Sequence, residues 1–160
     1  MKDAMKLPSS NPTKLQGKNL RIAIILPRFN DSLGNILLNN THETLLRRGV
    51  QGKNITLFRV PGALELPLTA KILAKKKKYD AIIALGVVIK GDTPHFEHVC
   101  TQCHRGLMDV GLETETPVIF GVITALNEQQ ARDRVEKKRL NKGRQYAETA
   151  IELANLLNSR

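Results

Sequence analysis

The turn Gly91-Asp92-Thr93-Pro94-His95 combines residue types that can bind an anion and transfer a proton. Gly91 allows a ligand to approach the backbone closely, and Pro94 suits the first position of a helix, where free amides attract phosphate groups. We expect Asp92 to contribute its backbone amide, since its carboxylate would repel phosphate. His95 follows one turn into the helix, where an imidazole can donate and accept protons near neutral pH.

The same turn has a purely structural interpretation, and so do the other polar groups of interest. Thr93 could simply cap the helix, and a single histidine is more often structural than catalytic. Phe29 and Asn30 could be a core aromatic followed by a helix cap. Glu65 could be a first-turn carboxylate that complements the helix dipole. A basic cluster could be either a solvated face or the source of an arginine that binds phosphate; it comprises Arg132, Arg134, Lys137, Lys138, Arg139 and Lys142.

The segment Cys100-Thr101-Gln102-Cys103-His104 matches the haem-attachment pattern of c-type cytochromes. Helical periodicity argues against haem, because both cysteines fall on one apolar stripe together with Phe96, Val99, Leu107 and Val110. A redox Cys-x-x-Cys pair would stand at a helix start, and a zinc site would need more ligands at ordered spacing. We therefore predict two buried structural thiols and no metal site.

These residues must be positioned by elements that alternate along the chain. Apolar runs predict strands, and helical patterns separate them. The expected strands are residues 22–26, 55–60, 81–88 and 118–122, and the expected helices are residues 32–48, 64–76, 94–110, 128–137 and 142–157. Strands that are apolar on both faces indicate a parallel sheet covered on both sides. The sequence thus predicts an α/β, three-layer sandwich with a four-stranded parallel sheet.

In such open sheets, ligands bind at the carboxyl ends of the strands. The polar turns singled out above follow the predicted strands, so we expect them to meet at one edge of the sheet. Residues 1–18 contain Pro8 and Pro12 and little apolar content, which predicts an extended arm outside the core. Residues 19–160 are expected to form a single domain.

Lys and Arg exceed Asp and Glu by 25 to 15, and the resulting net charge of +10 favours an anionic partner. Only 4% of residues are aromatic, and no basic segment carries the interleaved rings that stack on bases. We therefore predict no nucleic-acid partner. The run Lys75-Lys76-Lys77-Lys78 ends a predicted helix, where cations are favourable. The sequence has neither a membrane-spanning stretch nor an apolar signal segment, which predicts a cytoplasmic protein.

Five motifs at matching intervals across residues 20–157 resemble the lumazine synthase family. They are Arg28-Phe29-Asn30, Val60-Pro61-Gly62-Ala63-Leu64-Glu65-Leu66-Pro67, Gly86-Val87-Val88-Ile89-Lys90-Gly91-Asp92-Thr93-Pro94-His95-Phe96-Glu97, Pro117-Val118-Ile119-Phe120-Gly121-Val122-Ile123-Thr124, and Gln130-Ala131 through Arg134 followed by Asn141-Lys142-Gly143. One such motif would be weak, but the ordered set is specific. The resemblance also implies that the parallel sheet is of the flavodoxin-like type.

The resemblance implies the penultimate step of riboflavin biosynthesis. In that reaction 5-amino-6-(D-ribitylamino)uracil condenses with 3,4-dihydroxy-2-butanone 4-phosphate, which releases phosphate and water and gives 6,7-dimethyl-8-ribityllumazine. The reaction implies a transferase that needs no cofactor and no metal. Family members form homopentamers with active sites between subunits, and some assemble into decamers or sixty-subunit shells that can associate with riboflavin synthase.

The resemblance also implies roles for individual residues. Phe29 would stack on the pyrimidine, Ala63 and Leu64 would offer backbone contacts, and Glu65 would bind ribityl hydroxyls. Val87, Val88 and Ile89 would complete the uracil pocket, with Phe120 supplied by a neighbouring subunit. Asp92, Thr93 and Arg134 would hold the butanone phosphate, and His95 would shuttle protons.

Three features depart from the family pattern. Leu64 replaces a frequent aromatic, Lys90 stands where arginine is usual, and residues 135–140 lack the small residues and glycines common before Asn141-Lys142-Gly143. Both Arg132 and Arg134 are available to bind phosphate. Two alternatives also remain at this point. One is a flavodoxin-like module that binds flavin or a nucleotide, which lacks support because no Gly-rich loop follows the first strand. The other is a basic RNA-binding protein, for which charge is the only support.

Overall fold

A computed structural model describes residues 15–158 of the chain. Within that range the strands are β1 (Ile22–Pro27), β2 (Ile55–Val60), β3 (Ala81–Ile89) and β4 (Val118–Ala125). The α-helices are α1 (Asp31–Arg47), α2 (Leu66–Lys75), α3 (His95–Thr114), α4 (Glu128–Val135) and α5 (Lys142–Asn158). Two single 3-10 turns, η1 (Gly52–Asn54) and η2 (Ala63–Glu65), precede β2 and α2. The alternation of strands and helices predicted from the sequence is confirmed.

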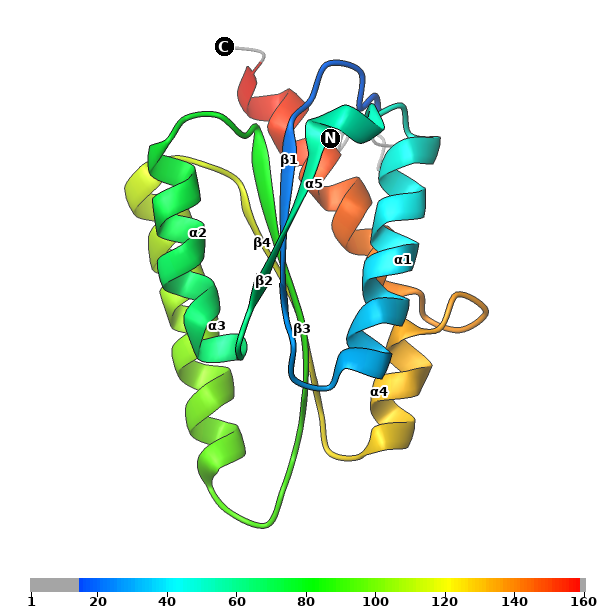
Figure 1. Cartoon of the computed structure of the whole chain (residues 1–160), viewed down its shortest axis with the longest axis vertical. Coiled ribbons are helices and arrows are strands. Elements are labelled where there is room, and N and C mark those ends of the chain that lie inside the picture. The colour runs from blue at the N-terminus through cyan, green and yellow to red at the C-terminus, as the bar shows by residue number, and fades with distance from the viewer. Residues whose placement is uncertain (1–14, 159–160) are drawn as a thin grey trace, which may run out of the picture.

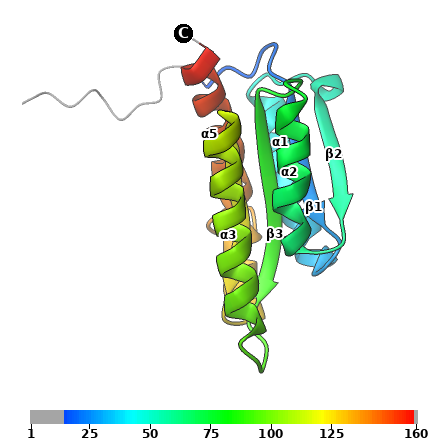
Figure 2. The ribbon, with the colours of Figure 1, turned by 90° about the vertical axis from the view of Figure 1, so that its left-hand side faces the viewer.

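All strand pairs of the sheet are parallel, in the order β2-β1-β3-β4. Helices α2 and α3 cover one face and α1, α4 and α5 cover the other, so the molecule has three layers (Figures 1 and 2). This is the predicted α/β sandwich with a flavodoxin-like arrangement. Strands β1 and β3 occupy the centre, which explains why β1 is buried at all six positions.

The two faces of the sheet carry separate cores because side chains alternate along each strand. Ile22, Ile24 and Leu26 of β1 pack toward α1, α4 and α5, whereas Ala23 and Ile25 belong to the cluster under α2 and α3. Both clusters consist mainly of aliphatic residues. The rigid central strands therefore fix where the loops at their ends begin.

Element boundaries differ from the sequence prediction at a few ends. Helix α2 begins at Leu66 because residues 63–65 form the tighter turn η2. Helix α3 continues to Thr114 and ends where Glu115 adopts a left-handed conformation with φ 53°. Strand β4 continues to Ala125, paired with Ile89 of β3. That extension brings the ends of β3 and β4 to the same level.

Of the predicted arm, residues 1–18, positions 1–14 lie outside the described residues. Its last part is attached to the body of the domain: Leu15 packs against the α1 side of the core, and the Gly17 amide donates to the Arg48 carbonyl at 2.7 Å. The division into arm and single domain stays a prediction.

The two cysteines lie on α3 but differ in burial. Cys103 is fully buried, as predicted, and burial raises the pKa of its thiol to about 12. Cys100 is only half-buried, so its assignment to the core was wrong, although burial also raises its pKa. Helix α3 has its apolar stripe centred on Val99, Cys103, Leu107 and Val110, which leaves Cys100 at the margin.

The lysine run does mark the end of α2, as predicted. Lys77 turns the chain with φ 52°, and its ammonium donates to the Thr114 carbonyl at 2.7 Å. A single lysine thereby satisfies an acceptor at the end of the neighbouring helix α3. No helix in the described part of the chain is long and apolar enough to cross a membrane.

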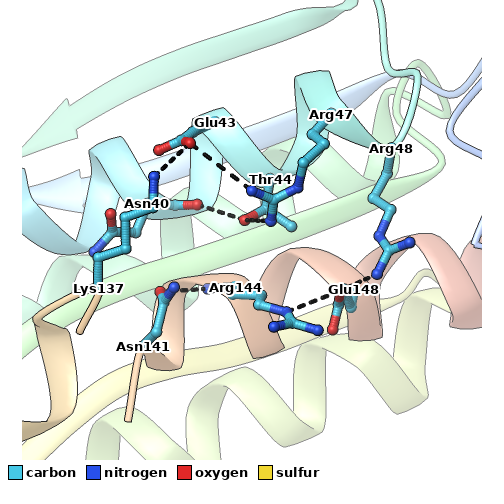
Figure 3. Close-up of polar contacts among 9 residues, drawn as sticks. All are labelled: Asn40, Glu43, Thr44, Arg47, Arg48, Lys137, Asn141, Arg144 and Glu148. Carbon is cyan, nitrogen blue, oxygen red and sulfur yellow. Dashed lines mark hydrogen bonds and ion pairs between the residues drawn. The ribbon is translucent and has the colours of Figure 1, made fainter. Parts of the chain in front are cut away.

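On the opposite face, polar side chains join α1 to α4 and α5 (Figure 3). Glu148 accepts hydrogen bonds from Arg48, which follows α1, and from Arg144 one turn earlier on α5. Asn40 is buried in α1 and donates to the Val135 carbonyl at the end of α4, at 2.8 Å. These bonds fix α4 and α5 relative to α1.

Candidate active site

The loops that follow β1, β2 and β3 surround one pocket at the carboxyl ends of these strands, at the lower end of the sheet in Figure 1. The pocket has a volume of about 380 Å³, which is in the range of small-molecule sites. Its lining consists of Pro27, Phe29, Gly62, Ala63, Leu64, Glu65, Val87, Val88, Ile89, Gly91, Thr93, His95, Phe96 and Val99. The sequence prediction that these loops meet is confirmed.

The first loop presents an aromatic ring to the pocket. Phe29 is 73% exposed, which is unusual for a phenylalanine and excludes the interpretation of this residue as a core aromatic. Asn30 follows with a left-handed backbone, φ 54° and ψ 45°. Its side chain does not cap α1, as the alternative interpretation proposed, but donates to the Val87 carbonyl of β3 at 2.8 Å.

The second loop is held by its own glutamate. The Gly62 amide donates to Glu65 Oε2 at 2.8 Å, so the carboxylate closes the turn η2 in the manner of a capping box. Ala63 and Leu64 lie between these two residues and line the pocket, and Leu64 is about half exposed. The structural interpretation of Glu65 is therefore correct, and the same carboxylate also borders the pocket.

The third loop places Thr93 and His95 at the start of α3. The hydroxyl of Thr93 accepts a long hydrogen bond, 3.4 Å, from the His95 amide at the first residue of α3. Thr93 and His95 line the pocket, and Gly91 lies beside them with open space where a Cβ would stand. Asp92 is exposed and is not part of the lining.

Lys90 and Glu97 hold the turn from both sides. The Lys90 amide donates to the Ala125 carbonyl of β4 at 2.9 Å, and its ammonium lies 3.2 Å from Glu97 on α3. The pKa of Glu97 is lowered by a hydrogen bond from its own backbone amide and by Lys90. The turn between strand and helix is thus fixed while its tip, with Thr93 and His95, stays open to ligand.

Besides Asp92, two more predicted site residues do not line this pocket. Phe120 on β4 stacks on His104 of α3, with ring centroids 4.3 Å apart, and borders a different hollow together with Met108 and Leu112. Arg134 on α4 donates to the Gln130 carbonyl at 2.8 Å. Within one chain, the structure brings together the first, second and third loops but not these two side chains.

Sequence reasoning missed several lining residues. Phe96 and Val99 were assigned only to the apolar stripe of α3, although the first turns of that helix face the pocket. Pro27 and Gly62 were regarded as turn residues alone. Pro27 ends β1, and Gly62 follows β2 by two positions; this place at the carboxyl ends of strands was the signal that could have identified them.

The arrangement can bind a flat ring and an anion side by side. Phe29 offers a ring face, and the end of β3 offers an apolar wall at Val87, Val88 and Ile89. The start of α3 offers amides and the nearby Thr93 hydroxyl, and His95 is the first residue of that helix. Among residues 15–158, no group of three or more His, Cys, Asp or Glu side chains could hold a metal ion.

Residues 19–158 match the family model for 6,7-dimethyl-8-ribityllumazine synthase. The match covers most of the chain and includes every loop of the pocket. It supports transferase activity in riboflavin biosynthesis and offers no support for a flavodoxin-like binding module. The chain therefore belongs to the 6,7-dimethyl-8-ribityllumazine synthase family, as an enzyme that forms the lumazine in riboflavin biosynthesis.

Proposed function

We propose that the pocket enclosed by the first three loops is where the lumazine forms. The observation that carries this proposal is the convergence of Phe29, Glu65 and His95, from three separate loops, on one pocket of suitable size. Each loop brings a different chemical function. The reaction requires mainly that two substrates be oriented and that protons be moved, and orientation alone supplies several kcal/mol.

The pyrimidine substrate occupies the apolar half in this proposal. Its ring stacks on Phe29 and rests against Val87, Val88 and Ile89, while the backbone of Ala63 and Leu64 contacts its ribityl chain. The Glu65 carboxylate accepts one hydrogen bond from the Gly62 amide and has further lone pairs, which bind ribityl hydroxyls. Leu64, which replaces an aromatic residue common in the family, gives this wall a flexible aliphatic surface.

The butanone phosphate occupies the half at the start of α3. Thr93 and the backbone of Asp92 hold the phosphate, and the helix N-terminus favours its charge. His95 transfers protons during imine formation between the uracil amine and the butanone carbonyl, and again during phosphate loss. Its place in the pocket lining, at the first residue of α3, supports this role.

A neighbouring subunit completes the pocket with Phe120 and Arg134, which lie outside it within one chain. The surface of the chain supports such a ring. Leu68 and Ile72 form an exposed apolar stripe on α2, and Met108 and Leu112 form a second one on α3. Two different apolar surfaces favour a heterologous contact, which closes a ring where the rotation between subunits allows it. The number of subunits follows the family pattern, and we therefore propose a homopentamer.

Larger assemblies, association with riboflavin synthase and a cytoplasmic location stay predictions. Free thiols at Cys100 and Cys103 are compatible with a reducing compartment. Light scattering of the purified protein distinguishes a pentamer from a decamer or a sixty-subunit shell.

The test is an absorbance assay in which the two substrates are mixed with purified protein. Replacing His95 with Ala should lower kcat by about 10²- to 10⁴-fold, the usual contribution of a general acid or base, with a small change in substrate affinity. His98→Ala is the matched control, because His98 is exposed on the same helix but outside the pocket lining. Unchanged turnover in His95→Ala would remove the proposed role. Salt-sensitive RNA binding without lumazine formation would favour the RNA-binding alternative.

A further inference from the structure

The hydrogen bond between Asn30 and Val87 joins two parts of the pocket that the sheet itself does not join. Strand β1 pairs with β2 as far as Pro27, but its pairing with β3 stops at Ile25 and Ala84. Strand β3 continues to Ile89 with β4 as its partner. Proline has no backbone N–H, so Pro27 cannot extend the ladder toward β3. The side chain of Asn30 provides a donor to β3 beyond that point.

The loop that carries Phe29 is consequently anchored on both sides. Before it, the Arg28 amide donates to the Val60 carbonyl of β2 at 2.8 Å. After it, Asn30 Nδ2 donates to the Val87 carbonyl at the same distance. Phe29 stands between these anchors, 73% exposed and with few neighbours of its own to hold its ring. The anchors therefore determine where the ring lies relative to the end of β3.

The backbone of Asn30 restricts which residues can serve here. Its φ of 54° lies in the left-handed region, which asparagine, aspartate and glycine adopt more readily than most residues. Of these three, only asparagine carries a side-chain N–H at neutral pH. Asparagine thus combines a favourable backbone preference with the donor.

We propose that Asn30 is a positioning residue for the pyrimidine substrate. It ties the loop that carries Phe29 to Val87 at the end of β3, so that both walls of the pyrimidine half keep one relative position, without contacting the reacting atoms. This inference rests on the proposed function, specifically on Phe29 and Val87 as the walls of the pyrimidine half. It adds a determinant of substrate affinity outside the pocket lining, since Asn30 is not among the lining residues.

The experiment compares Asn30→Asp and Asn30→Gly, which both tolerate the backbone conformation but cannot donate to Val87. Calorimetry measures the dissociation constants of 5-amino-6-(D-ribitylamino)uracil and of inorganic phosphate separately. Both variants should bind the pyrimidine about tenfold more weakly, in line with the loss of one partly buried hydrogen bond, and Asn30→Gly should bind phosphate as the wild type does. A purely structural role would instead weaken both ligands together with a lower Tm.

A double-mutant cycle with Phe29→Ala tests whether Asn30 acts through the ring. If it does, Phe29→Ala combined with Asn30→Gly binds the pyrimidine no more weakly than Phe29→Ala alone. Two outcomes would overturn the inference and leave the proposed function intact. In the first, the losses of affinity from the two substitutions add. In the second, both Asn30 variants bind the pyrimidine as the wild type does while Phe29→Ala binds it more weakly. Wild-type affinity in Phe29→Ala would instead overturn the proposed stacking wall, and the inference with it.

Discussion

Arg132 and Arg134 lie two positions apart on α4, but their guanidinium groups have different partners. Arg132 donates twice to the carboxylate of Glu128, at 2.8 and 3.1 Å, so its charge is already compensated. Arg134, by contrast, donates to the neutral carbonyl of Gln130, which does not compensate the charge of the guanidinium. A phosphate ligand needs an uncompensated cation with free donors, and Arg134 fits that requirement better.

Replacing Arg134 with Ala should raise the KM for the butanone phosphate by about 10- to 100-fold, the range for a lost charge-assisted hydrogen bond. The KM for the pyrimidine should change little, because the pyrimidine half contains no arginine. Steady-state kinetics with each substrate varied in turn would measure both constants.

Arg132→Ala provides the matched control and should keep both KM values within about twofold, as surface ion pairs contribute little. A selective effect in Arg132→Ala, or a rise confined to the pyrimidine KM in Arg134→Ala, would show that the phosphate arginine was misassigned.

Residue types and their place after strands were enough to predict most of the pocket. Phe29, Glu65, Thr93 and His95 all line it, as expected from loops that end parallel strands. The hydrogen-bond partners of residues next to these four were not predictable. The bond from Asn30 to Val87 spans 57 positions and depends on where β1 leaves β3, which no local pattern encodes.

At the scale of secondary-structure elements, the closest approach between α1 and α5 occurs at Gly143. A Cβ at this position would lie 2.7 Å from the Leu37 carbonyl and 2.9 Å from the Thr41 hydroxyl. Both atoms belong to the rigid helix α1, so they cannot move aside cheaply. The absence of a side chain at Gly143 therefore allows the two helices to pack against each other.

Gly143→Ala should lower the free energy of unfolding by about 1–3 kcal/mol, the usual cost of overpacking. Gly34→Ala is the matched control within α1, because its Cβ would meet only the Leu26 side chain at 3.4 Å. There the higher helix propensity of alanine should leave stability unchanged or raise it by up to about 1 kcal/mol. Urea denaturation measures both, and equal effects in the two variants would contradict the packing argument.

The carboxylate of Glu148 connects the same two helices and makes their packing depend on pH (Figure 3). Burial alone would raise its pKa, but hydrogen bonds from Arg48 and Arg144 outweigh burial and lower the pKa below the ordinary value of 4.5. A carboxyl whose pKa is lower in the folded state stabilises the protein above its unfolded pKa. That contribution is lost as pH falls below about 4.5.

Glu148→Gln should therefore be less stable than the wild type at pH 7, and the difference should shrink as the pH falls through this window. Thermal unfolding of both proteins between pH 7 and pH 3 would measure the trend. Glu152→Gln, one turn further along α5, serves as the control and should show a constant small difference. A Glu148→Gln effect that is independent of pH would argue against the ionised pair.

The order of elements was predictable because hydrophobic periodicity extends over each whole strand and helix. The residues at which these elements begin and end were less predictable. The helical pattern from Leu64 onward suggested one continuous helix, but the Gly62–Glu65 hydrogen bond tightens the first turn into η2. Strand β4 extends to Ala125 because β3 offers a partner as far as Ile89, and a single segment of sequence does not reveal its partner's length.

At the scale of the whole molecule, the layer formed by α2 and α3 exposes large apolar side chains. Leu68 of α2 and Leu112 of α3 are 67% and 71% exposed. Phe120, stacked on His104, lies in the hollow beside Leu112. Exposed apolar surface of this kind is typical of protein interfaces, and its position beside Phe120 agrees with a pocket completed by the next subunit.

Leu112→Glu should dissociate the proposed pentamer, because a charge at a buried apolar contact carries a large desolvation cost. Activity should fall with it, since Phe120 and Arg134 would no longer reach a neighbouring pocket. Light scattering would give the mass and the absorbance assay the activity. Leu46→Glu, at an exposed leucine on α1, should change neither. A Leu112→Glu protein of unchanged mass would place the subunit contact elsewhere.

The packing of α5 against α1 also constrains how the chain can fold as it is synthesised. Ala147, Ala150 and Ile151 of α5 belong to the same core cluster as Leu37 and Leu45 of α1, although about a hundred residues separate them. Until α5 leaves the ribosome, that face of the central sheet is covered only by α1 and α4, and part of its aliphatic surface faces water. A chain that lacks α5 should therefore be more prone to aggregation than the complete domain.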